Sequence, residues 1–576
     1  MPRVEMGSSD ENHTGSATRR AWGLACAALC AIALASGCTS PREWWANGWK
    51  VGPQYCDPGA MVGRDWIDGD DRRVIRSPAD HAAWWATFND PLLNEFVAQA
   101  YQQNLTLREA GARIIEARAL RDFAVGNFFP QRQDVSASYS HNLSTGTGPN
   151  RHFSVWNGSF NFAWELDFWG RYRRAVEASD ADLQATVFEY GDVVVTLVAD
   201  VAATYVDIRT LQKQLELVRD NEENQRKTYE LILERFNAGD LSDVDVQQAK
   251  SSLAQTEAFV PQLEIALRQS QNALCVLLGM PPEDLAARLG RGEIPNVGTE
   301  VAVGIPAETL MRRPDVRRAE RRLAAQSARI GVAESDWYPG ITLSGGVGVS
   351  ANQFGDLFRN GSSFGSIGPS LRWNILNYGR ILANVEVQDA RFQQLLANYR
   401  QTVLLANLEA ENAIIQFLKS QERLESQLEA AEAANKTNDL INLQLEVGEA
   451  DINRVFNVQN FKTQQEQNAA TAKGDVAQNL ISIYRAVGGG WPSPFLGQPV
   501  LQPPSVEEVP AGAPQADGDE PADGGLGLPL ENGDNAPAEG EDLPAPDEPL
   551  AFPKSVAPLP PVSQSSLRPP KASAAS

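Results

Sequence analysis

The sequence predicts a mainly α-helical protein with a small β part, in which long antiparallel helical hairpins carry pairs of strands. Three observations predict this fold class. One is an internal repeat with a spacing of 209 residues, and another is two very long stretches without proline, 172–260 and 380–487. The third is a set of four segments in which apolar and polar residues alternate, as in strands with one apolar face.

The N-terminus has the features of a secretory signal. An apolar run, Ala21–Ala35, follows two arginines and precedes Ser36, Gly37 and Cys38. Such a run is too short to span a membrane as a helix. The segment 35–38 resembles the lipobox of bacterial lipoproteins, so we expect Cys38 to become an acylated N-terminus. The alternative is ordinary cleavage beside an incidental cysteine.

The repeat organises the rest of the chain. Its halves run from about 88 to 285 and from about 307 to 490, with a linker at 286–306. Several pairs of residues share the same spacing, which indicates that one fold was built twice. These pairs are Pro130 and Pro339, Trp164 and Trp373, Gly170-Arg171 and Gly379-Arg380, Gly239 and Gly448, and Gly279 and Gly488.

Each half begins with a helical segment, expected at 90–127 and 307–335, and continues into two strands. Segments of about 10 to 13 residues match the length that a tilted strand needs to cross a bilayer. Pro369 is unfavourable in a central strand and indicates a strand end or a bulge. We expect Ser136, Ser138, Thr342 and Ser344 on a polar, lumen-facing surface, and Ile341, Leu343 and Val347 on the lipid-facing surface.

After each strand pair a very long helix is expected. Apolar residues between Leu197 and Val218 recur in steps of three and four, which is typical of a coiled-coil seam. A continuous helix from Tyr172 to Phe236 would be about 100 Å long at ~1.5 Å per residue, so it forms a rod rather than part of a globule. Pro261 should kink the first returning helix. Gly170, Arg171, Gly379 and Arg380 mark the turns from strand to helix.

The rods turn back at two matching tips. A glycine just beyond a helix end is the usual left-handed cap, and a short polar side chain can then cap the returning helix. These residues are the candidate site, either as a gate or as a surface for a partner protein, although the acids could serve only as caps. They are Gly239, Asp240, Ser242, Asp243 and Asp245 on the first tip, and Gly448, Glu449, Asp451 and Arg454 on the second.

The two ends of the chain complete the predicted layout: a signal peptide at 1–37, a lipidated segment at 38–87 and a tail at 491–576. The tail is rich in proline and acid, with 13 Asp or Glu and no Lys or Arg between Ser505 and Leu550, and we expect it to be disordered. The tail therefore holds much of the net charge of −23.

Composition excludes several classes of function. No clustered positive surface for nucleic acid is evident. The four histidines lie outside any metal-ligand spacing, and we find no phosphate loop or nucleophile motif, so we expect no metal, no cofactor and no catalysis. Cys56 and Cys275 are expected to be free thiols, with a bridge between them as the alternative.

Four strands cannot seal themselves in lipid, because every lipid-facing backbone group must be paired. A closed barrel needs at least about 8 strands, so self-association is required. Three chains would give a 12-stranded transmembrane β-barrel joined to a trimeric α-barrel of helical hairpins. The alternative of another class is a periplasmic coiled-coil scaffold without a pore.

Several short motifs lie between residues 50 and 490. They are Val51-Gly52-Pro53-Gln54-Tyr55, Trp84-Trp85-Ala86-Thr87-Phe88-Asn89-Asp90-Pro91-Leu92, Phe128-Phe129-Pro130, Trp164-Glu165-Leu166-Asp167-Phe168-Trp169-Gly170, and the tip sequences Arg235-Phe236-Asn237-Ala238-Gly239 and Ser242-Asp243-Val244-Asp245. In these motifs the chain resembles the outer membrane efflux protein family, that of TolC and OprM, and especially its lipoprotein branch of the NodT type. The similarity covers residues 50 to 490.

The resemblance implies a lipid-anchored homotrimer in the outer membrane with a long periplasmic extension. Its tips would meet an adaptor protein and, through it, an inner-membrane pump of the RND type, so the chain would be the passive exit duct for small molecules. A duct for type I protein secretion is the alternative within the class. Family members often have aspartates six and nine residues past the second tip glycine; here Arg454 and Asn457 stand there, and Arg454 could pair with a neighbouring acid.

Overall fold

The computed structural model describes residues 41–59, 62–76, 81–144, 151–304, 306–446 and 451–491. The chain divides into two units, 1–498 and 499–576, and all the described residues belong to the first. The expected signal peptide, Cys38, the acidic tail, and Gly448 and Glu449 of the second tip lie outside the described residues.

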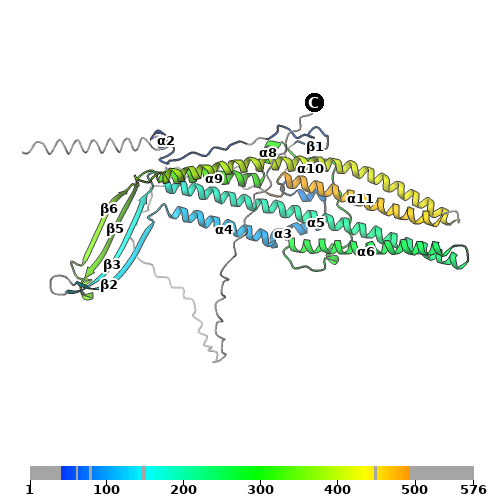
Figure 1. The fold of residues 1–576 in the computed structure, drawn as a ribbon, viewed down its shortest axis with the longest axis horizontal. Helices are drawn as coiled ribbons and strands as arrows, with labels where there is room; N and C mark the ends of the chain where they lie inside the picture. Colours follow the sequence, from blue (N-terminus) through cyan, green and yellow to red (C-terminus); the bar gives the residue numbers. More distant parts are fainter. Residues whose placement is uncertain are drawn as a thin grey trace, which may run out of the picture. The chain divides into compact units, whose positions relative to one another are not determined.

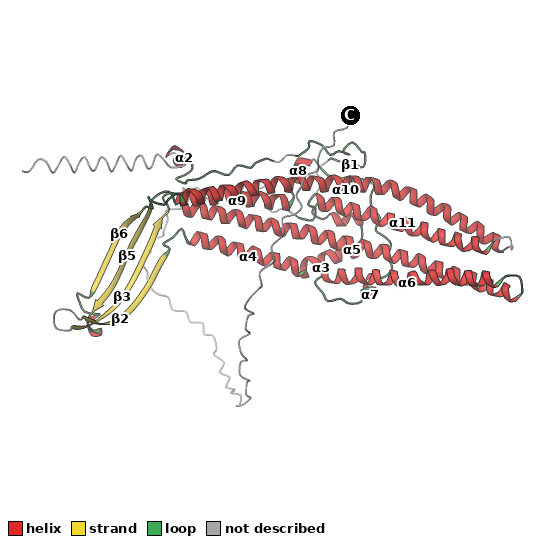
Figure 2. Ribbon diagram, in the orientation of Figure 1, coloured by secondary structure: helices red, strands yellow, loops and turns green. Residues whose placement is uncertain are grey.

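Two helical hairpins of matching dimensions dominate the fold (Figures 1 and 2). Helix α5 (Arg171–Asn237) and helix α10 (Arg380–Glu446) each have 67 residues, and the returning helices α6 (Asp243–Leu277) and α11 (Ile452–Ala486) each have 35. At ~1.5 Å per residue, α5 and α10 are each about 100 Å long. The predicted rods are confirmed, and α6 runs through Pro261 without ending there.

The helical segment that opens each half is interrupted once. In the first half, α3 (Pro91–Gln103) and α4 (Leu105–Gly126) meet at Asn104, whose side chain accepts a hydrogen bond from the N–H of Leu107. In the second half, α8 (Pro306–Leu310) and α9 (Pro314–Ser335) are separated by three residues. A proline at the start of α9 disfavours helical backbone in the residue before it. The single helices expected there are therefore each two.

The interruptions are chemically equivalent although the residues differ. The Asn104 side chain donates to the Leu277 carbonyl (2.9 Å), and the Arg313 side chain donates to the Ala486 carbonyl (2.7 Å). Each donor pair and each acceptor pair is 209 residues apart. In both halves, the residue just before the second opening helix therefore donates a hydrogen bond to a carbonyl in the last turn of the returning helix. Such a carbonyl has no partner within its own helix.

Four strands form one antiparallel sheet in the order β2-β3-β5-β6. Their bounds are Arg132–Ser144, Arg151–Leu166, Gly340–Ala351 and Ser363–Arg372. The register places Phe160 opposite both Val135 and Val347, so the apolar residues of neighbouring strands share a face. Ser159 pairs in the same way with Ser136 and Gly348 on the other face. The predicted alternation is confirmed. Pro369 marks neither a strand end nor a bulge: it lies within β6, in register with Leu343, and it is tolerated there because β6 is an edge strand of this sheet.

The hydrophobic core lies where the helical hairpins meet the opening helices. Phe96 of α3, Tyr205 of α5, Leu274 of α6 and Phe417 of α10 are all buried there. Helix α9 packs between α5 and α10, whereas within the chain α4 packs mainly on α5. Among the described residues, no helix has the length and the apolar content needed to cross a membrane.

Short elements complete the described structure. Cys56 is exposed and Cys275 is buried, and both are free thiols. The parallel strands β1 and β4 form a second, two-stranded sheet. The short elements are α2 (Pro41–Ala46), β1 (Val74–Ile75), η1 (Trp84–Phe88), α7 (Ala286–Leu289), β4 (Val301–Ala302) and η2 (Phe354–Asp356).

Candidate functional site

The first tip is a short turn held by its own backbone. Gly239 has a φ of +86°, which favours glycine, and its N–H donates to the Phe236 carbonyl (2.9 Å). The N–H of Asp240 donates to the Arg235 carbonyl (3.0 Å). These two bonds are the Schellman pattern that ends a helix. Asp240 itself is exposed, so its carboxylate faces solvent.

The acids that follow begin helix α6. The Asp245 carboxylate accepts hydrogen bonds from the backbone N–H (3.0 Å) and the hydroxyl (2.7 Å) of Ser242. These hydrogen bonds lower the pKa of the Asp245 carboxyl. Asp243 accepts only a long bond from Gln247 (3.3 Å) and is exposed. Asp245 is therefore occupied in capping, whereas Asp240 and Asp243 present charge to the outside.

The described part of the second tip has a different polarity. Asp451 caps α11 by accepting a hydrogen bond from the Asn453 N–H (2.9 Å). Arg454 is exposed, and its guanidinium makes no hydrogen bond or ion pair with any described residue. Because Arg454 lies 209 residues after Asp245, the two tips present opposite charges at equivalent positions.

The two tips pack on each other. Ile232 of α5, Val246 of α6 and Phe456 of α11 form a small buried cluster. The Arg235 guanidinium donates to the Leu445 carbonyl of α10 (3.2 Å). The sequence does not predict this bond, because its partners are 210 residues apart and no local pattern marks either of them.

Farther from the tips the seam between the hairpins is polar. Gln225 donates to the Asn460 side chain (2.8 Å) and accepts from the Thr256 hydroxyl (2.9 Å). A cavity of about 570 Å³ lies nearby, lined by residues of α5, α10 and α11. Two buried amide oxygens in its lining, on Asn438 and Gln459, have no hydrogen-bond partner among the described residues. Buried polar groups of this kind hold a seam less firmly than an apolar core does.

At the opposite end of the rods lie the two turns from strand to helix. Gly170 and Gly379 have φ values of +83° and +79°, so both turns use a left-handed glycine. The indole N–H of Trp164 donates to the Phe128 carbonyl, and that of Trp373 donates to the Trp337 carbonyl, both at 3.1 Å. The turns are thus built alike in the two halves.

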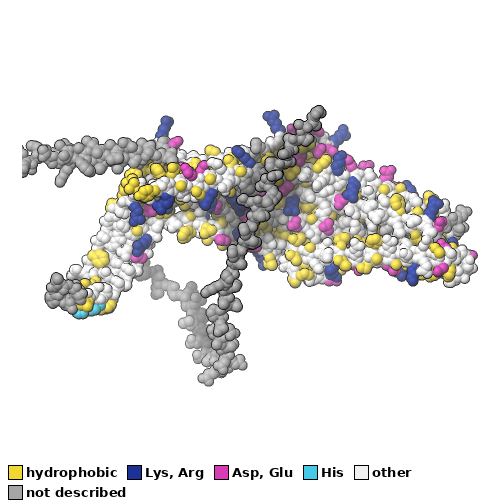
Figure 3. All heavy atoms as spheres, viewed as in Figure 1, with side chains coloured by type: hydrophobic (Ala, Val, Ile, Leu, Met, Phe, Trp, Pro, Cys, Tyr) yellow, Lys and Arg dark blue, Asp and Glu magenta, His cyan; other side chains and the backbone are white. Residues whose placement is uncertain are grey.

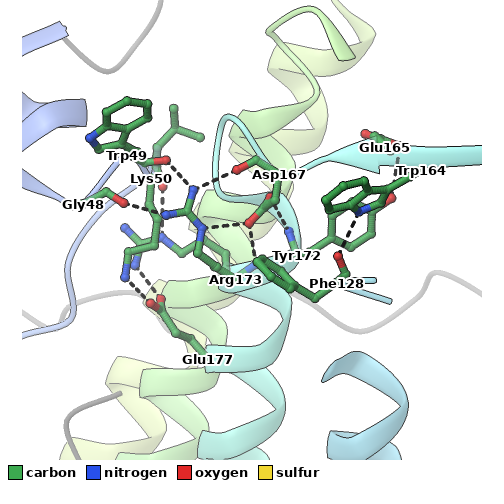
Figure 4. A network of polar contacts seen from close by, with 12 residues as sticks. Gly48, Trp49, Lys50, Phe128, Trp164, Glu165, Asp167, Tyr172, Arg173 and Glu177 are labelled. Atoms are coloured by element: carbon green, nitrogen blue, oxygen red, sulfur yellow. Dashed lines mark hydrogen bonds and ion pairs between the residues drawn. The ribbon is translucent and has the colours of Figure 1, made fainter. Parts of the chain in front are cut away.

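The N-terminal segment, 44–52, covers the first turn, and Figure 4 shows its residues Gly48, Trp49 and Lys50 beside the start of α5. The Arg173 guanidinium donates to the carbonyls of Gly48 (2.7 Å) and Trp49 (2.8 Å) and to the Asp167 carboxylate (2.8 Å). A Cβ on Gly170 would lie 2.6 Å from the Lys50 side chain, so this glycine is also needed for close packing. Arg173 therefore fixes the segment to the start of α5.

A second arginine extends this contact into the interior. The buried Arg174 donates to the carbonyls of Val51 (3.0 Å) and Gly52 (2.9 Å). Glu177 accepts from Arg174 (2.9 Å) and pairs with Lys50. The backbone of Gly52 lies against Gly331 of α9, where a Cβ would be 2.3 Å from the Gly331 Cα. We call this set of contacts of residues 48–52 with α5 and α9 the N-terminal clamp.

Ion pairs link α5 to α9 along their length. Asp192 pairs with Arg318 (3.1 Å), and Asp182 pairs with Arg329. Burial raises the pKa of both carboxyls, and the arginines oppose that effect. The described residues contain no group of three or more His, Cys, Asp or Glu side chains placed to hold a metal ion.

Comparison with known proteins identifies the architecture. The family model for outer membrane efflux proteins matches twice, at 96–280 and at 305–489. The chain belongs to the outer membrane efflux protein family. The two matches begin 209 residues apart, at the spacing of the sequence repeat. The family assigns the chain to the outer membrane and to transport.

Individual members of the family are similar over most of the chain. Nodulation protein T of Rhizobium leguminosarum bv. trifolii is 30% identical, over 77% of this chain and 95% of the relative. The pyoverdine export outer membrane protein OpmQ of Pseudomonas aeruginosa is 27% identical, over 72% and 89%. The solved outer-membrane channel OprN has a TM-score of 0.73 at 33% identity, covering 77% of this chain and 99% of that one.

Proposed function

We propose that the chain forms the outer-membrane exit duct of a tripartite efflux pump. Three copies conduct small molecules passively, and a periplasmic adaptor opens the duct at its helical tips and joins it to an inner-membrane pump of the RND type. The observation that carries the proposal is the four-stranded sheet: one of its faces is apolar, and its outer edges on β2 and β6 have no strand partner among the described residues.

The sheet supports closure by identical copies. Unpaired strand edges are not tolerated in lipid, so β6 of one copy pairs with β2 of the next. The observed pairing of β3 with β5 is a template for the register between copies. The pair Ala137–Gly158 in the first half takes the place of Gly345–Ile367 in the second, so β3 matches β6 at a spacing of 209 residues and β2 matches β5 at 208. Phe162 of β3 lies opposite Gly345 of β5. The residues in the same places are Leu371 of β6 and Ala137 of β2, so Leu371 of one copy should lie opposite Ala137 of the next. Twelve strands then close one barrel.

The helices support the same arrangement. In α4, Ile115 is 70% exposed and Phe123 is equally so, whereas the equivalent positions in α9, Ala324 and Val332, pack within the chain. Because α9 fills the space between α5 and α10, α4 should fill the equivalent space between α5 and the α10 of a neighbouring copy. Val387 of α10 is exposed on the partner helix.

The N-terminal clamp supports a lipid anchor on Cys38. Described structure begins only three residues after this cysteine. Trp44 contacts Trp49 and Phe168 at ring centroid distances of 5.0 and 5.3 Å, close to the turn from strand to helix. Aromatic side chains favour the interface between membrane and water. The clamp thus holds the anchor beside the proposed barrel.

The tips supply the adaptor surface and the gate. Asp240 and Asp243 carry charges that no described ion pair neutralises, and basic groups of an adaptor would complement them. The polar seam between the hairpins lets them separate when the adaptor favours a splayed state. Asp451 and Arg454 belong to the second half of this proposed surface, and Gly448 and Glu449, predicted for it from the sequence, lie outside the described residues.

Small solutes are favoured over secreted proteins as cargo. The names of two relatives describe pyoverdine export and cation efflux, and neither names a secreted protein. The same architecture also suits type I protein secretion, so the cargo is an outcome of the test.

The test combines conductance with export. Purified protein should run as a heat-modifiable trimer and form ion-conducting pores in planar bilayers. In cells lacking the gene, the wild type should restore resistance to a panel of antibiotics, dyes and metals, and Asp243→Lys should not, although its trimers form normally. This variant leaves the bonds between Ser242 and Asp245 intact. The matched control is Glu432→Lys, an exposed charge reversal on α10.

Three results would contradict the proposal. A water-soluble monomer without conductance would favour the scaffold without a pore. If the chain supports export of a protein while the resistance of the cells to small molecules is unchanged, the duct serves protein secretion. Unchanged export by Asp243→Lys would remove this acid from the adaptor surface and gate.

A further inference from the structure

Two histidines come together at the end of the sheet that is away from the helices, where Figure 3 shows histidine side chains. His141 of β2 lies opposite Ser154, and His152 of β3 lies opposite Leu143, so the two imidazoles are diagonal neighbours on one face. Their ring centroids are 5.6 Å apart and the planes differ by 22°. Both side chains are exposed.

The surroundings orient one ring. The Nδ1 atom of His141 lies 3.0 Å from the Ser154 hydroxyl, which also contacts the Tyr139 hydroxyl (3.4 Å). A hydrogen bond at one ring nitrogen fixes the imidazole and leaves the other nitrogen, Nε2, for a ligand. Within the described residues neither imidazole pairs with a carboxylate, so no internal salt bridge competes for them.

Two adjacent imidazoles have a specific chemistry. Neutral imidazole nitrogen binds Cu²⁺, Ni²⁺ and Zn²⁺ well, with bonds of about 2.0–2.1 Å to zinc. Two nitrogens must approach to about 4 Å to share one ion at that bond length. The stacked rings must turn about their side-chain bonds to aim both nitrogens at one ion, and both side chains are exposed, so they are free to do so. They lie on the face that carries Val135 and Phe160, at its end beyond Tyr139 and Trp156. Water would fill the remaining coordination positions, which suits weak and reversible binding.

We propose that His141 and His152 form a binding site for a late first-row transition-metal ion. Its location at the outer rim of the duct rests on the proposed function, whereas the binding itself does not.

The experiment uses the untagged full-length protein in detergent, titrated with NiCl₂ and separately with CuCl₂. A Cys56→Ser background removes the exposed thiol, which binds the same ions. At pH 7.5 we expect about one ion per chain. His141→Asn and His152→Asn should each weaken binding at least about tenfold, as expected for loss of a ligand.

His81 supplies the matched control. It lies against Tyr484, on the helical part of the fold, with ring centroids 5.7 Å apart. His81→Asn should leave metal binding unchanged. The electron paramagnetic resonance spectrum of bound Cu²⁺ should show two nitrogen ligands, and one fewer in each rim variant. Equal binding by the wild type and both rim variants, or an equal loss in His81→Asn, would overturn the proposal. Bilayer conductance of the rim variants tests the duct separately.

Discussion

The two turns from strand to helix share a backbone and differ in chemistry. In the first half, Arg173 donates hydrogen bonds to Asp167 and to the N-terminal segment, and Arg174 donates to the N-terminal segment. The residues 209 positions later are Leu376, Leu382 and Ala383. Gly170 is packed against Lys50, whereas a Cβ on Gly379 would meet nothing within 4 Å.

The difference follows from what each turn must hold. A chain has one N-terminal segment, so only one of its two turns can be covered by it. The covered turn needs hydrogen-bond donors for the carbonyls of that segment, because buried carbonyls must be paired. The other turn has no such requirement, and Tyr378 there is 95% exposed. A repeat can therefore keep its backbone while its side chains adapt to one additional contact.

Of the changes that distinguish the two turns, removal of the buried arginine of the first turn should have the largest effect. Arg174→Ala would leave the Val51 and Gly52 carbonyls without their donors, at a cost of about 3 kcal/mol. We expect the N-terminal segment to detach and to be cut rapidly by trypsin near Lys50. The control is Ala383→Ser at the equivalent position, which should leave cleavage unchanged. A protected segment in Arg174→Ala would show that the N-terminal clamp does not depend on this arginine.

Alanine substitutions of the glycines that follow the two returning helices should cost different amounts of stability in the two halves, and this difference should be smaller than the effect at Arg174. Gly279 and Gly488 have φ values of +75° and +74°, but a Cβ would lie 2.3 Å from the Gln103 carbonyl oxygen in the first case and 3.3 Å from the Arg313 Cα in the second. Gly279→Ala should cost about 2–3 kcal/mol and Gly488→Ala about 1 kcal/mol. The temperature at which the heated protein aggregates would rank them. Equal losses would mean that the φ value alone sets the cost.

Helices α4 and α9 offer a comparison at the proposed contact between copies. Ile115→Asp places a charge on the exposed face of α4 and should weaken trimers by about 1–2 kcal/mol per contact, because apolar area is no longer buried. Light scattering in detergent would detect the dissociated chains. Ile67→Asp is the control, since Ile67 is 83% exposed in a loop. Stable trimers in Ile115→Asp would show that α4 does not contribute to the contact between copies.

The smallest effect is expected from acid at the tips. The lowered pKa of Asp245 means that its hydrogen bonds stabilise the start of α6 above the ordinary value of 3.8 and are lost as the pH falls through the lower folded value. Amide exchange in the first turn of α6, corrected for intrinsic rates, should therefore accelerate in that acidic range. Asp245→Asn should abolish this dependence, and Arg454→Gln should retain it. The same pH profile in wild type and Asp245→Asn would exclude Asp245 as the source.

The sequence was informative where structure depends on local pattern. Long helices without proline, alternating strands and the glycine at 239 all follow from neighbouring residues. The break at Asn104 was overlooked although asparagine is a good N-cap, because the apolar pattern continues across it. The N-terminal clamp could not be foreseen, since its partners are more than 120 residues apart. The motif Val51-Gly52 stands out in the sequence, but only the structure reveals the close contact of Gly52 with Gly331.

The central claim is that identical copies share one barrel and one ring of helices. An electron cryomicroscopy structure of the purified protein in lipid nanodiscs tests it most directly. We expect three copies around one lumen, with Leu371 of β6 opposite Ala137 of β2 in the next copy and α4 packed against the neighbouring α10. A single chain with uncovered β2 and β6 edges, or copies joined through other surfaces without a common lumen, would contradict the account.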